Sequence, residues 1–455
     1  MAFSSRVFQH PAAHEEVFYA TCHPGLESVV ADELQAPGTG ATGVEPGRAG
    51  VHFRGATLET GYRANLWLSS AIRVLVRQAE GQLDPRRQGG DELYALFRRA
   101  VDWPALLAPG QCFSVEARVA GCTEVRSALL VQMRLRDAIC DAMRDAGREK
   151  PMPPREGAVA ELPLFVTANR DRVTLFRDMS GASLHRRGYR QGAMHAAALN
   201  EAAASGVLAL AGWPALCQRE GAVLADPMCG AGTLLIEAAL AAVRAAPGLS
   251  RPSWPFEVWP DFDAGAWERL REGARAAKRE PPAGLRLLGN DSHAGALAMA
   301  RRGAEAAGIG HLIELSHGPC SEWRGHLVGD PRRDPVARSR GRSSGGTDDT
   351  GRRSGAGVEA KAPEAELEAA WRDLGVFLKG ACNEADAFLL CGNPDATRSL
   401  HMRCSRRIPL SIGGADVRLL HYVVLPPLPP GTRPPSAKKS LAQPIPGRAS
   451  EPLDW

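Results

Sequence analysis

The feature that most constrains this chain is a glycine-rich turn between a short apolar run and a long apolar segment. The turn reads Asp226-Pro-Met-Cys-Gly-Ala-Gly-Thr233. Glycines at 230 and 232 let the backbone bend tightly and approach a ligand without a clash from a Cβ atom. The helix expected over 233–245 would present free N–H groups and the positive end of its dipole. The pattern predicts a strand–turn–helix unit that binds a nucleotide-like molecule.

A second turn supports this interpretation. The strand expected over 285–291 ends in Gly-Asn-Asp, so that Asn290 and Asp291 close it. An acid at the end of the second strand can accept hydrogen bonds from both hydroxyls of a ribose. Either turn alone could serve packing only. Together, in strand–helix–strand order, they favour a nucleotide-like ligand, and the absence of GxGxxG spacing argues against a dehydrogenase.

The pattern of apolar residues changes near residue 207, from a strand–helix mixture of the α+β kind to regular alternation. In the first half we expect strands at 17–22, 50–54, 112–120, 164–168 and 172–176, and helices at 26–34, 64–75 and 126–146. In the second half we expect strands at 223–226, 285–291, 312–316 and 387–391, helices at 233–245, 294–307 and 364–379, and a hairpin of 408–412 with 417–424. The alternation predicts a doubly wound sheet.

Residues 329–363 interrupt the alternation. They contain eight basic and five acidic residues and almost no large apolar side chain. Such a composition cannot bury a core, so it predicts disorder.

Composition restricts the class of protein. The net charge is only +4, so binding to nucleic acid would depend on local basic patches. None of the ten cysteines forms a CxxC pair, which predicts reduced thiols in an intracellular protein and no zinc site. No run of 18 apolar residues occurs, so we expect no membrane span. The compartment, whether cytoplasmic or organellar (plastid or mitochondrion), stays open.

Several motifs resemble those of one family. DPMCGAGT with the later Gly-Asn-Asp resembles the cofactor motifs of class I S-adenosylmethionine-dependent methyltransferases that act on exocyclic amino groups of bases. The block Ser183-Leu-His-Arg-Arg-Gly-Tyr-Arg190 resembles a signature of the bacterial-type large-subunit rRNA guanine-N2 methyltransferases, which carry a THUMP RNA-binding domain ahead of the catalytic domain. FYATCHPGLESVVADEL and WRDLGVFLKGACNEADAFLLCGNPDATRSL are similar to that family as well.

The resemblance implies an α/β fold, with a Rossmann-like class I methyltransferase domain preceded by an α+β ferredoxin-like/THUMP RNA-binding half. The expected segments are a leader (1–16), a ferredoxin-like subdomain (17–78), a THUMP domain (79–177), the first part of the methyltransferase domain (178–328), a disordered insert (329–363), the last part of that domain (364–424) and a Pro-rich tail (425–455).

It also implies S-adenosyl-L-methionine as the cofactor and the N2 amino group of a guanine in large-subunit rRNA as the target. The residues expected to bind the cofactor are Asp226, Pro227, Cys229, Gly230, Gly232, Thr233, Asn290 and Asp291. RNA is the expected partner, neither a metal nor a membrane is implied, and no catalytic residue is identified.

Arg186, Arg187, Tyr189 and Arg190 form a basic and aromatic group that we expect to face RNA. Arg contacts phosphate, and Tyr or Arg planes can stack on unpaired bases. A solvated charged loop with a Tyr between domains is the structural alternative.

One family motif is missing. The family usually carries Asn-Pro-Pro-aromatic at the end of the fourth strand, where acceptors hold the amino group of the target base. No Asn-Pro-Pro occurs here, and Asn393-Pro394, followed by Asp395, matches a later part of the family pattern. The motif should lie between 316 and 364, so one strand could be missing there as well. The chain is then either an incomplete version of a functional enzyme or a degenerate member.

Two alternatives to rRNA methylation therefore stay open. One is a catalytically impaired THUMP protein that only binds RNA, and the other is a methyltransferase that acts on tRNA.

Overall fold

The structure is a computed structural model that describes residues 15–190, 199–323, 335–340, 364–393 and 395–426. It contains two seven-stranded sheets, one in each half of the chain. In the described part of the chain, no helix is long and apolar enough to cross a membrane.

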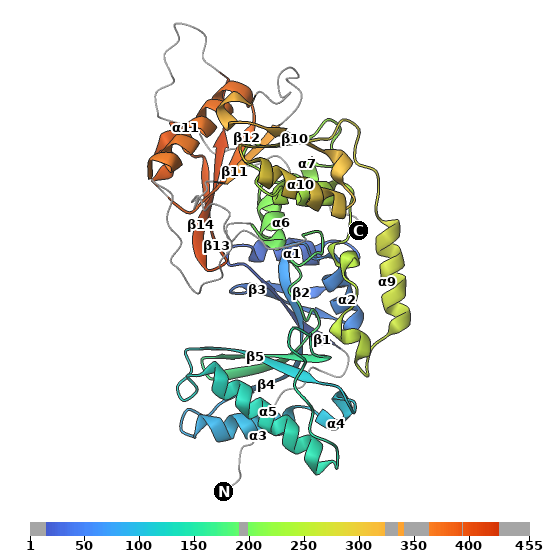
Figure 1. The fold of residues 1–455 in the computed structure, drawn as a ribbon. Coiled ribbons are helices and arrows are strands. Elements are labelled where there is room, and N and C mark those ends of the chain that lie inside the picture. The colour runs from blue at the N-terminus through green and yellow to red at the C-terminus, as the bar shows by residue number, and fades with distance from the viewer. Residues whose placement is uncertain (1–14, 191–198, 324–334, 341–363, 394, 427–455) are drawn as a thin grey trace.

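The first sheet has the order β2-β3-β1-β4-β7-β6-β5. Its strands are β1 (Glu16–Cys22), β2 (Thr42–Pro46), β3 (Gly50–Gly55), β4 (Ala71–Gln82), β5 (Phe113–Ala120), β6 (Leu162–Asn169) and β7 (Arg172–Asp178). Its helices are α1 (Glu27–Gln35), α2 (Leu58–Trp67), α3 (Gly89–Ala100), α4 (Trp103–Leu106) and α5 (Ala128–Asp145). Figure 1 shows α3 and α5 at the bottom of the molecule, under the β4–β5 end of the sheet.

The long strand β4 joins the two parts of the N-terminal half. It pairs with β1 through residues 71–76 and with β7 through residues 75–82, antiparallel in both cases. The boundary that we expected at residue 78 therefore falls inside one continuous strand. The ferredoxin-like part and the segment after it share a single sheet, and neither can turn without breaking ladder hydrogen bonds.

The second sheet has the order β10-β9-β8-β11-β12-β14-β13. Its strands are β8 (Val223–Asp226), β9 (Arg286–Asp291), β10 (Ile313–His317), β11 (Pro335–Arg340), β12 (Asp386–Cys391), β13 (Arg406–Ile412) and β14 (Ala415–Val423). Its helices are α6 (Glu201–Leu210), α7 (Trp213–Leu216), α8 (Thr233–Ala242), α9 (Ala264–Ala276), α10 (Ala294–Ala306) and α11 (Glu364–Ala381). Short 3₁₀ helices are η1 (Pro247–Ser250), η2 (Pro255–Val258), η3 (Gly310–Leu312), η4 (Cys320–Glu322) and η5 (Ala396–Leu400).

This sheet is the doubly wound sheet that the alternation predicted. β8, β9, β10, β11 and β12 are parallel, and β14 runs antiparallel to both β12 and β13. The strand order reverses between β8 and β11, and ligands of such sheets bind at the carboxyl ends of the strands beside this point. The turn that follows β8 lies there.

The fourth strand of the parallel sheet is present. β11 pairs with β8 through Pro335–Ala337 and with β12 through Val336–Arg340. The prediction of disorder across 329–363 was wrong for these six residues, and the rest of that segment lies outside the described residues. The reason is the backbone: β8 and β12 both need a partner for their N–H and C=O groups, and this need outweighs the poor apolar content of PVARSR.

A second expectation also fails. The helix predicted over 64–75 is α2, which ends at Trp67, and residues 71–75 belong to β4. The chain leaves the helix at Ser69 and Ser70, whose N–H and hydroxyl groups all donate to the Glu33 carboxylate on α1. The following AIRVLV run then pairs on both sides within the sheet, so tertiary pairing overrides the helical spacing.

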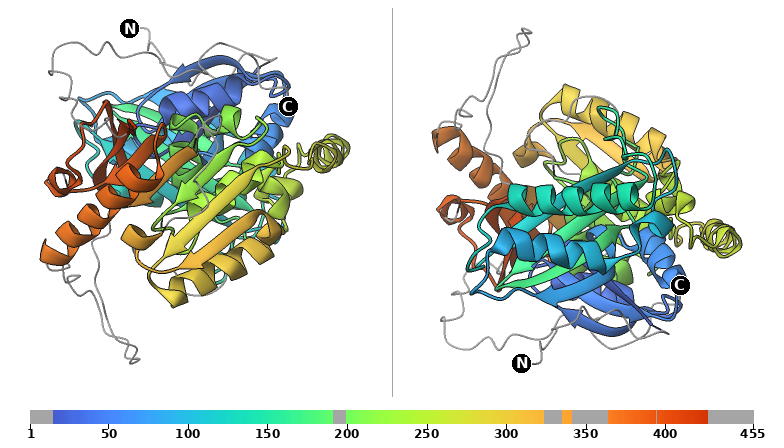
Figure 2. Two further views of the ribbon diagram at one scale, coloured as in Figure 1. Left: turned by 90° about the horizontal axis from the view of Figure 1, so that it is seen from above. Right: turned by 90° about the horizontal axis from the view of Figure 1, so that it is seen from below.

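An aromatic cluster fastens the two halves together. Trp254, Phe256 and Trp267 from the segment between α8 and β9 pack in edge or stacked contacts, with ring centroids 5.2–6.0 Å apart. Phe256 also lies 4.7 Å from Tyr62 on α2, measured between ring centroids. Figures 1 and 2 show α9, which carries Trp267, along the side of the molecule. The segment thus ties the second half to the first.

A polar contact reinforces this cluster. Arg177 of β7 makes two hydrogen bonds to Asp261, of 2.9 and 2.6 Å, and lies 4.2 Å from the centre of the Trp259 ring. The Trp259 indole donates to the Glu161 carbonyl at 2.9 Å. The halves are therefore joined by directional bonds as well as by apolar burial.

We predict that Trp267→Ala lowers the free energy of unfolding by about 3–5 kcal/mol, because it removes a buried ring from this cluster. Val258→Ala is the matched control, since Val258 lies in the same segment but is 49% exposed. It should change the free energy by less than about 0.5 kcal/mol. Urea unfolding followed by fluorescence measures both, and equal losses would contradict the role of the cluster.

Candidate cofactor-binding site

The turn after β8 has the conformation that its glycines allow. Gly230 and Gly232 have φ of +57° and +72°, in the left-handed region that other residues rarely adopt. Gly232 is the N-cap of α8, and a Cβ atom there would lie 2.9 Å from the Cβ of Ala300 on α10. At Gly230 an added Cβ would meet no atom of the described residues within 4 Å. The turn is therefore closed toward α10 and open above Gly230.

Asn290 stabilises the glycine turn through hydrogen bonds to its backbone. It is 1% exposed, and its amide donates to the Pro227 carbonyl at 3.2 Å and to the Gly318 carbonyl at 2.9 Å. The backbone carbonyl of Asn290 accepts a hydrogen bond from the Cys229 N–H at 2.8 Å. Asn290 thus links β9 to the loops that follow the neighbouring strands β8 and β10, and all three of these hydrogen bonds are to the backbone.

Asp291 reaches the glycine turn directly. One carboxylate oxygen accepts from the Gly230 N–H at 2.8 Å, and the other accepts from the His293 N–H at 2.9 Å. The side chain is held at the edge of the open space above Gly230. The oxygen that accepts from the His293 N–H also lies 3.1 Å from Nδ1 of the same residue, whereas the oxygen at Gly230 keeps acceptor capacity for a hydroxyl group.

Asp226 and Cys229 of the same turn are buried. Asp226 is 3% exposed at the end of β8 and accepts from the Met228 N–H at 3.3 Å. Burial raises the pKa of the Cys229 thiol well above its usual value, and Asp226 and Asp291 raise it further. Cys229 is therefore a neutral packing residue of the turn and not a nucleophile.

The structure thus brings together all eight residues that we expected at the cofactor, and the contact between the two turns joins residues 61 positions apart in sequence. Their roles in binding stay predictions. The arrangement fits a nucleoside ligand: an open backbone turn, the N-terminus of a long helix and a fixed carboxylate lie on one edge of the sheet. In the described ranges, no group of three or more His, Cys, Asp or Glu side chains could hold a metal ion.

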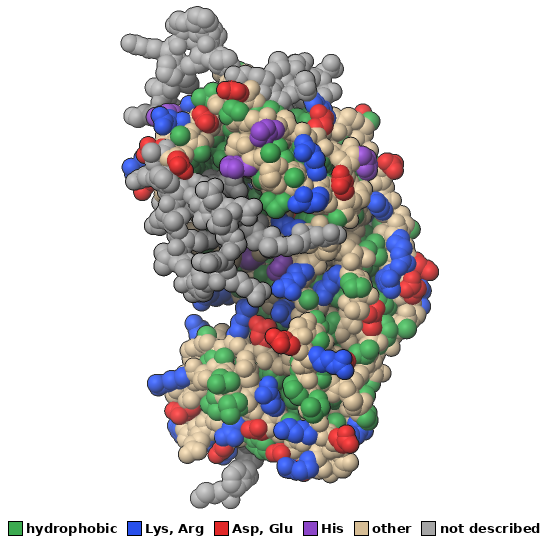
Figure 3. Space-filling view, in the orientation of Figure 1, with side chains coloured by type: hydrophobic (Ala, Val, Ile, Leu, Met, Phe, Trp, Pro, Cys, Tyr) green, Lys and Arg blue, Asp and Glu red, His purple; other side chains and the backbone are tan. Residues whose placement is uncertain are grey.

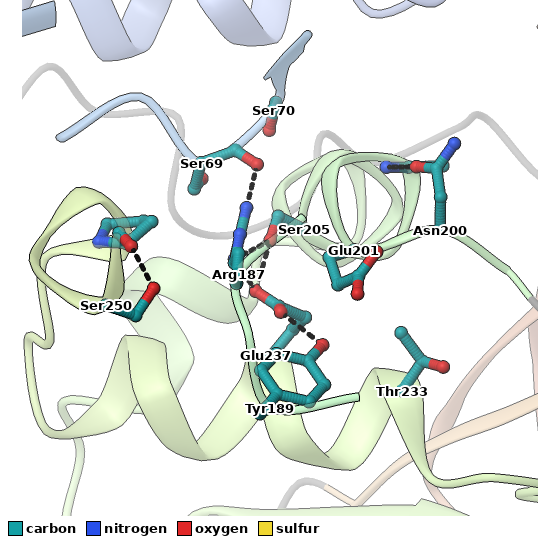
Figure 4. A network of polar contacts seen from close by, with 12 residues as sticks. Ser69, Ser70, Arg187, Tyr189, Asn200, Glu201, Ser205, Thr233, Glu237 and Ser250 are labelled. Atoms are coloured by element: carbon teal, nitrogen blue, oxygen red, sulfur yellow. Dashed lines mark hydrogen bonds and ion pairs between the residues drawn. The ribbon is translucent and has the colours of Figure 1, made fainter. Parts of the chain in front are cut away.

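A buried polar network stands behind this turn, and Figure 4 shows it. Glu237 of α8 is 3% exposed and accepts hydrogen bonds from Arg187, from the Tyr189 hydroxyl at 2.7 Å and from the Ser205 hydroxyl at 2.8 Å. Arg187 also donates to the Ser69 carbonyl of the N-terminal half. The Glu237 carboxylate therefore connects α8 with α6 and, through Arg187, with the loop between α2 and β4.

This network contradicts the expected RNA contact of Arg187 and Tyr189. Each is 4% exposed, so neither presents a surface to a large ligand. The physical reason is that a buried carboxylate needs a paired cation and hydrogen-bond donors, and these two side chains supply them. Arg186 is exposed, and its contact with RNA stays a prediction.

Arg190 lies nearer to the glycine turn. Its guanidinium donates to the Thr233 hydroxyl and, at 2.6 Å, to the Leu199 carbonyl. It also forms an ion pair with Glu201 of α6, with 3.4 Å between Nε and Oε1. Arg190 therefore contacts the first residue of α8, and its partners among the described residues belong to the protein's own interior. Its expected contact with RNA stays a prediction.

Glu201, Ser205 and Glu237 were not expected from the sequence. One signal was present: Glu237 is the only charged residue in the apolar helix TLLIEAALAA. A lone acid on a helix that is apolar all round must be paired or neutral, which could have led to a search for its cation.

Asn393 follows β12, the strand beyond β11 in the sheet. Its side-chain oxygen accepts from the Asp395 N–H at 3.0 Å. Asn393 therefore follows the fifth parallel strand, whereas the family's Asn-Pro-Pro motif is expected after the fourth. That place, directly after β11, lies outside the described residues, and the sequence there reads Gly-Arg-Ser-Ser.

Comparison with known proteins agrees with this geometry. Residues 187–326 match a model described as an RMKL-like methyltransferase domain, and residues 17–75 match the RlmL ferredoxin-like domain. A ribosomal RNA large subunit methyltransferase K/L of Syntrophotalea carbinolica is 35% identical over 420 residues, which cover 89% of this chain and 53% of that protein. The namesake from Chromohalobacter salexigens is 40% identical over 65% of this chain and 39% of its own length. The chain spans about half the length of the curated relatives that it matches.

Solved structures share the fold. SMU.472, in complex with SAH, superimposes with a TM-score of 0.72 at 22% identity, over 91% of this chain and 99% of that one. TrmN from Thermus thermophilus gives a TM-score of 0.60 at 18% identity, over 90% of this chain and all of that one. With a ferredoxin-like domain in front and the methyltransferase fold behind it, the chain belongs to the RMKL-like methyltransferase family and is related to the ribosomal RNA large subunit methyltransferases K/L.

Proposed function

We propose that this chain transfers a methyl group from S-adenosylmethionine to the exocyclic N2 amino group of a guanine in large-subunit rRNA. The observation that carries the proposal is the contact between the Asp291 carboxylate and the Gly230 N–H, which joins the two cofactor motifs in one open turn. The relatives that cover most of the chain are named for rRNA methylation, and SMU.472 holds SAH in the same fold.

Different residues of the turn would contact different parts of the cofactor. The Asp291 carboxylate would accept from the two ribose hydroxyls, and the backbone at Gly230 and Gly232 would lie against the ligand without a Cβ in the way. The free N–H groups at the N-terminus of α8 would face the negatively charged part of the cofactor. The bound cofactor would supply the activated methyl group. Asn290 would keep the turn in shape through its three backbone contacts.

The target amino group needs acceptors that hold its hydrogens while its nitrogen attacks the methyl group. If these are present, no general base is required at the nitrogen itself. In a doubly wound sheet such acceptors belong at the carboxyl edge, where β11 ends beside β8.

RNA would dock on the N-terminal half, for which the THUMP assignment of 79–177 stays a proposal. Figure 3 shows Lys and Arg side chains spread among Asp and Glu over the visible face rather than gathered in one field. Binding should then depend on local patches, such as one around the exposed Arg186. Large-subunit rRNA is the substrate that the relatives' names favour, and tRNA stays the alternative substrate.

A specific observation also favours the second candidate, an RNA-binding protein that has lost catalysis. No Asn-Pro-Pro occurs in the sequence, so the usual acceptors of the target base are missing. This candidate predicts binding of rRNA that weakens steeply with salt, without transfer of a methyl group.

We predict incorporation of labelled methyl from S-adenosylmethionine into rRNA isolated from cells that lack this modification. Nucleoside analysis should locate the label on guanine N2, because the amino group is the nucleophile. Absence of label on rRNA that the folded protein binds would contradict the catalytic proposal and support the second candidate. Label on tRNA alone would contradict the choice of substrate.

We predict that Asp291→Asn weakens the binding of S-adenosylhomocysteine about 10- to 100-fold, since it removes the charge that strengthens hydrogen bonds from the ribose. Isothermal titration calorimetry measures the affinity. Glu305→Gln on α10 is the control, because Glu305 is exposed, and it should bind like the parent. An unchanged affinity of the folded Asp291→Asn variant would exclude the ribose contact.

A further inference from the structure

We propose that a pocket on the first sheet binds one unpaired guanine of the RNA, a different base from the one that is methylated. The inference rests on the proposed function, because the ligand that it names belongs to an RNA strand. It assigns base recognition to Arg73 and Glu116, which lie outside both cofactor motifs and outside the basic group at 186–190.

The pocket opens on the face of the first sheet away from α3 and α5. Glu116 of β5 pairs with Phe165 of β6, and Ser114 pairs with Pro163, so these four side chains point to one face. The alternate residues, such as Leu164, point to the other face and pack with the helices in the main core. The four side chains on the open face line the pocket together.

The pocket and the glycine turn belong to different sheets. Figure 1 shows β4 and β5 in the lower part of the molecule and β10, β11 and β12 in the upper part. The base that receives the methyl group belongs at the carboxyl edge of the upper sheet. A base held in the lower pocket would therefore be a second contact, and it would fix which nucleotide of the strand reaches the turn.

The size and the walls of the pocket suit a single base. Its volume is about 200 Å³, whereas pockets for drug-sized molecules measure about 300–1,000 Å³. Pro163, Phe165 and Val159 provide apolar surface, and Arg73 and Glu116 provide polar groups. A planar base needs both, because its faces pack on apolar or aromatic side chains while its edge forms hydrogen bonds.

The protein itself fixes the guanidinium of Arg73. Nη1 donates to the Asp178 carboxylate and, at 2.7 Å, to the Gly181 carbonyl. Asp178 is 2% exposed and also accepts from the N–H groups of Ser180 and Gly181, at 2.9 and 3.0 Å. The other terminal nitrogen, Nη2, lies 3.4 Å from Oε2 of Glu116. Arg73 therefore presents Nη2 beside the Glu116 carboxylate in a defined orientation.

Glu116 is the exposed acceptor of the pocket. Its side chain is 47% exposed and makes two long ion pairs, of 3.4 Å to Arg73 and 4.0 Å to Arg118. Charge-assisted hydrogen bonds between N–H and carboxylate measure about 2.7–2.9 Å, so neither contact uses the full acceptor capacity of the carboxylate. The two oxygens can therefore accept from a ligand.

A carboxylate beside a guanidinium donor matches the Watson–Crick edge of guanine. That edge carries two neighbouring donors, N1–H and N2–H, next to the acceptor O6. The Glu116 carboxylate can accept from both donors, and Nη2 of Arg73 can donate to O6. Adenine, cytosine and uracil each turn a ring acceptor or a carbonyl toward the carboxylate, which leaves a polar group unmatched. Two carboxylates face one guanidinium here, so the charge also disfavours a phosphate.

Arg118 supplies positive charge beside the pocket. Its side chain is 68% exposed, and its guanidinium carbon lies 5.4 Å from the centre of the Phe165 ring. An exposed Arg in this position suits a phosphate of the bound strand, and phosphate contacts carry no information about the base. Arg118 and Glu116 should therefore contribute to affinity and to base preference, respectively.

Fluorescence anisotropy of labelled single-stranded RNA octamers tests the pocket on the full chain without cofactor. The octamers are oligouridine with one central guanosine, adenosine or inosine, and inosine lacks only the N2 amino group of guanosine. The parent protein should bind the guanosine octamer about 10- to 100-fold more tightly than the adenosine octamer, with inosine between them. Glu116→Gln should reduce this preference to within about twofold.

Glu124→Gln is the matched control, because it removes the same charge from another exposed position of the first half and should keep the preference. Arg118→Met should weaken all octamers alike and leave the preference unchanged. The preference is a ratio of affinities for one protein sample, so partial unfolding of a variant would not alter it. If guanosine monophosphate displaces the guanosine octamer as effectively as unlabelled octamer does, the pocket serves a free nucleotide and the RNA ligand is wrong.

The outcomes distinguish this inference from the proposed function. Equal binding of the three octamers by the parent, or a preference that Glu116→Gln leaves intact, would overturn the inference, and methyl transfer to rRNA would still decide the function by itself. If the preference depends on Glu116 but no methyl group is transferred, the inference holds and the proposed function gives way to the RNA-binding candidate.

Discussion

The buried carboxylate of Glu237 is the constraint on which the arrangement of the cofactor site depends. It lies one helical turn after Thr233 on α8 and cannot remain charged in the interior without cations and donors. Arg187, Tyr189 and Ser205 supply them. Because Arg187 also bonds to a carbonyl of the first half, the helix that opens at the glycine turn is fixed against the ferredoxin-like domain. Pairing of one charge thus sets the orientation of the turn.

Two further features fix the two halves of the chain relative to each other. β4 runs through both parts of the first sheet, and the aromatic segment between α8 and β9 packs back on α2. A substrate bound by the N-terminal half would therefore meet the carboxyl edge of the second sheet at a fixed distance. The chemistry of methyl transfer needs such positioning, since the reacting atoms must be held within a few tenths of an ångström of a productive geometry.

The sequence predicted what depends on local backbone geometry. The turn of Gly230 and Gly232 and the acid Asp291 are recognisable because their conformations and order along the chain follow from residue type. The prediction failed where a distant partner decides. Arg187 looked like a surface cation because Glu237 is 50 residues away in sequence. β11 looked like a segment without structure because only its neighbours' unpaired backbone groups make it a strand.

The most direct test of the account is an experimental structure of the protein with S-adenosylhomocysteine bound. The account predicts the ligand on the turn between β8 and α8, with its ribose hydroxyls within hydrogen-bond distance of Asp291. A ligand bound elsewhere, or a ribose that contacts no carboxylate, would contradict the assignment of this turn as the cofactor site.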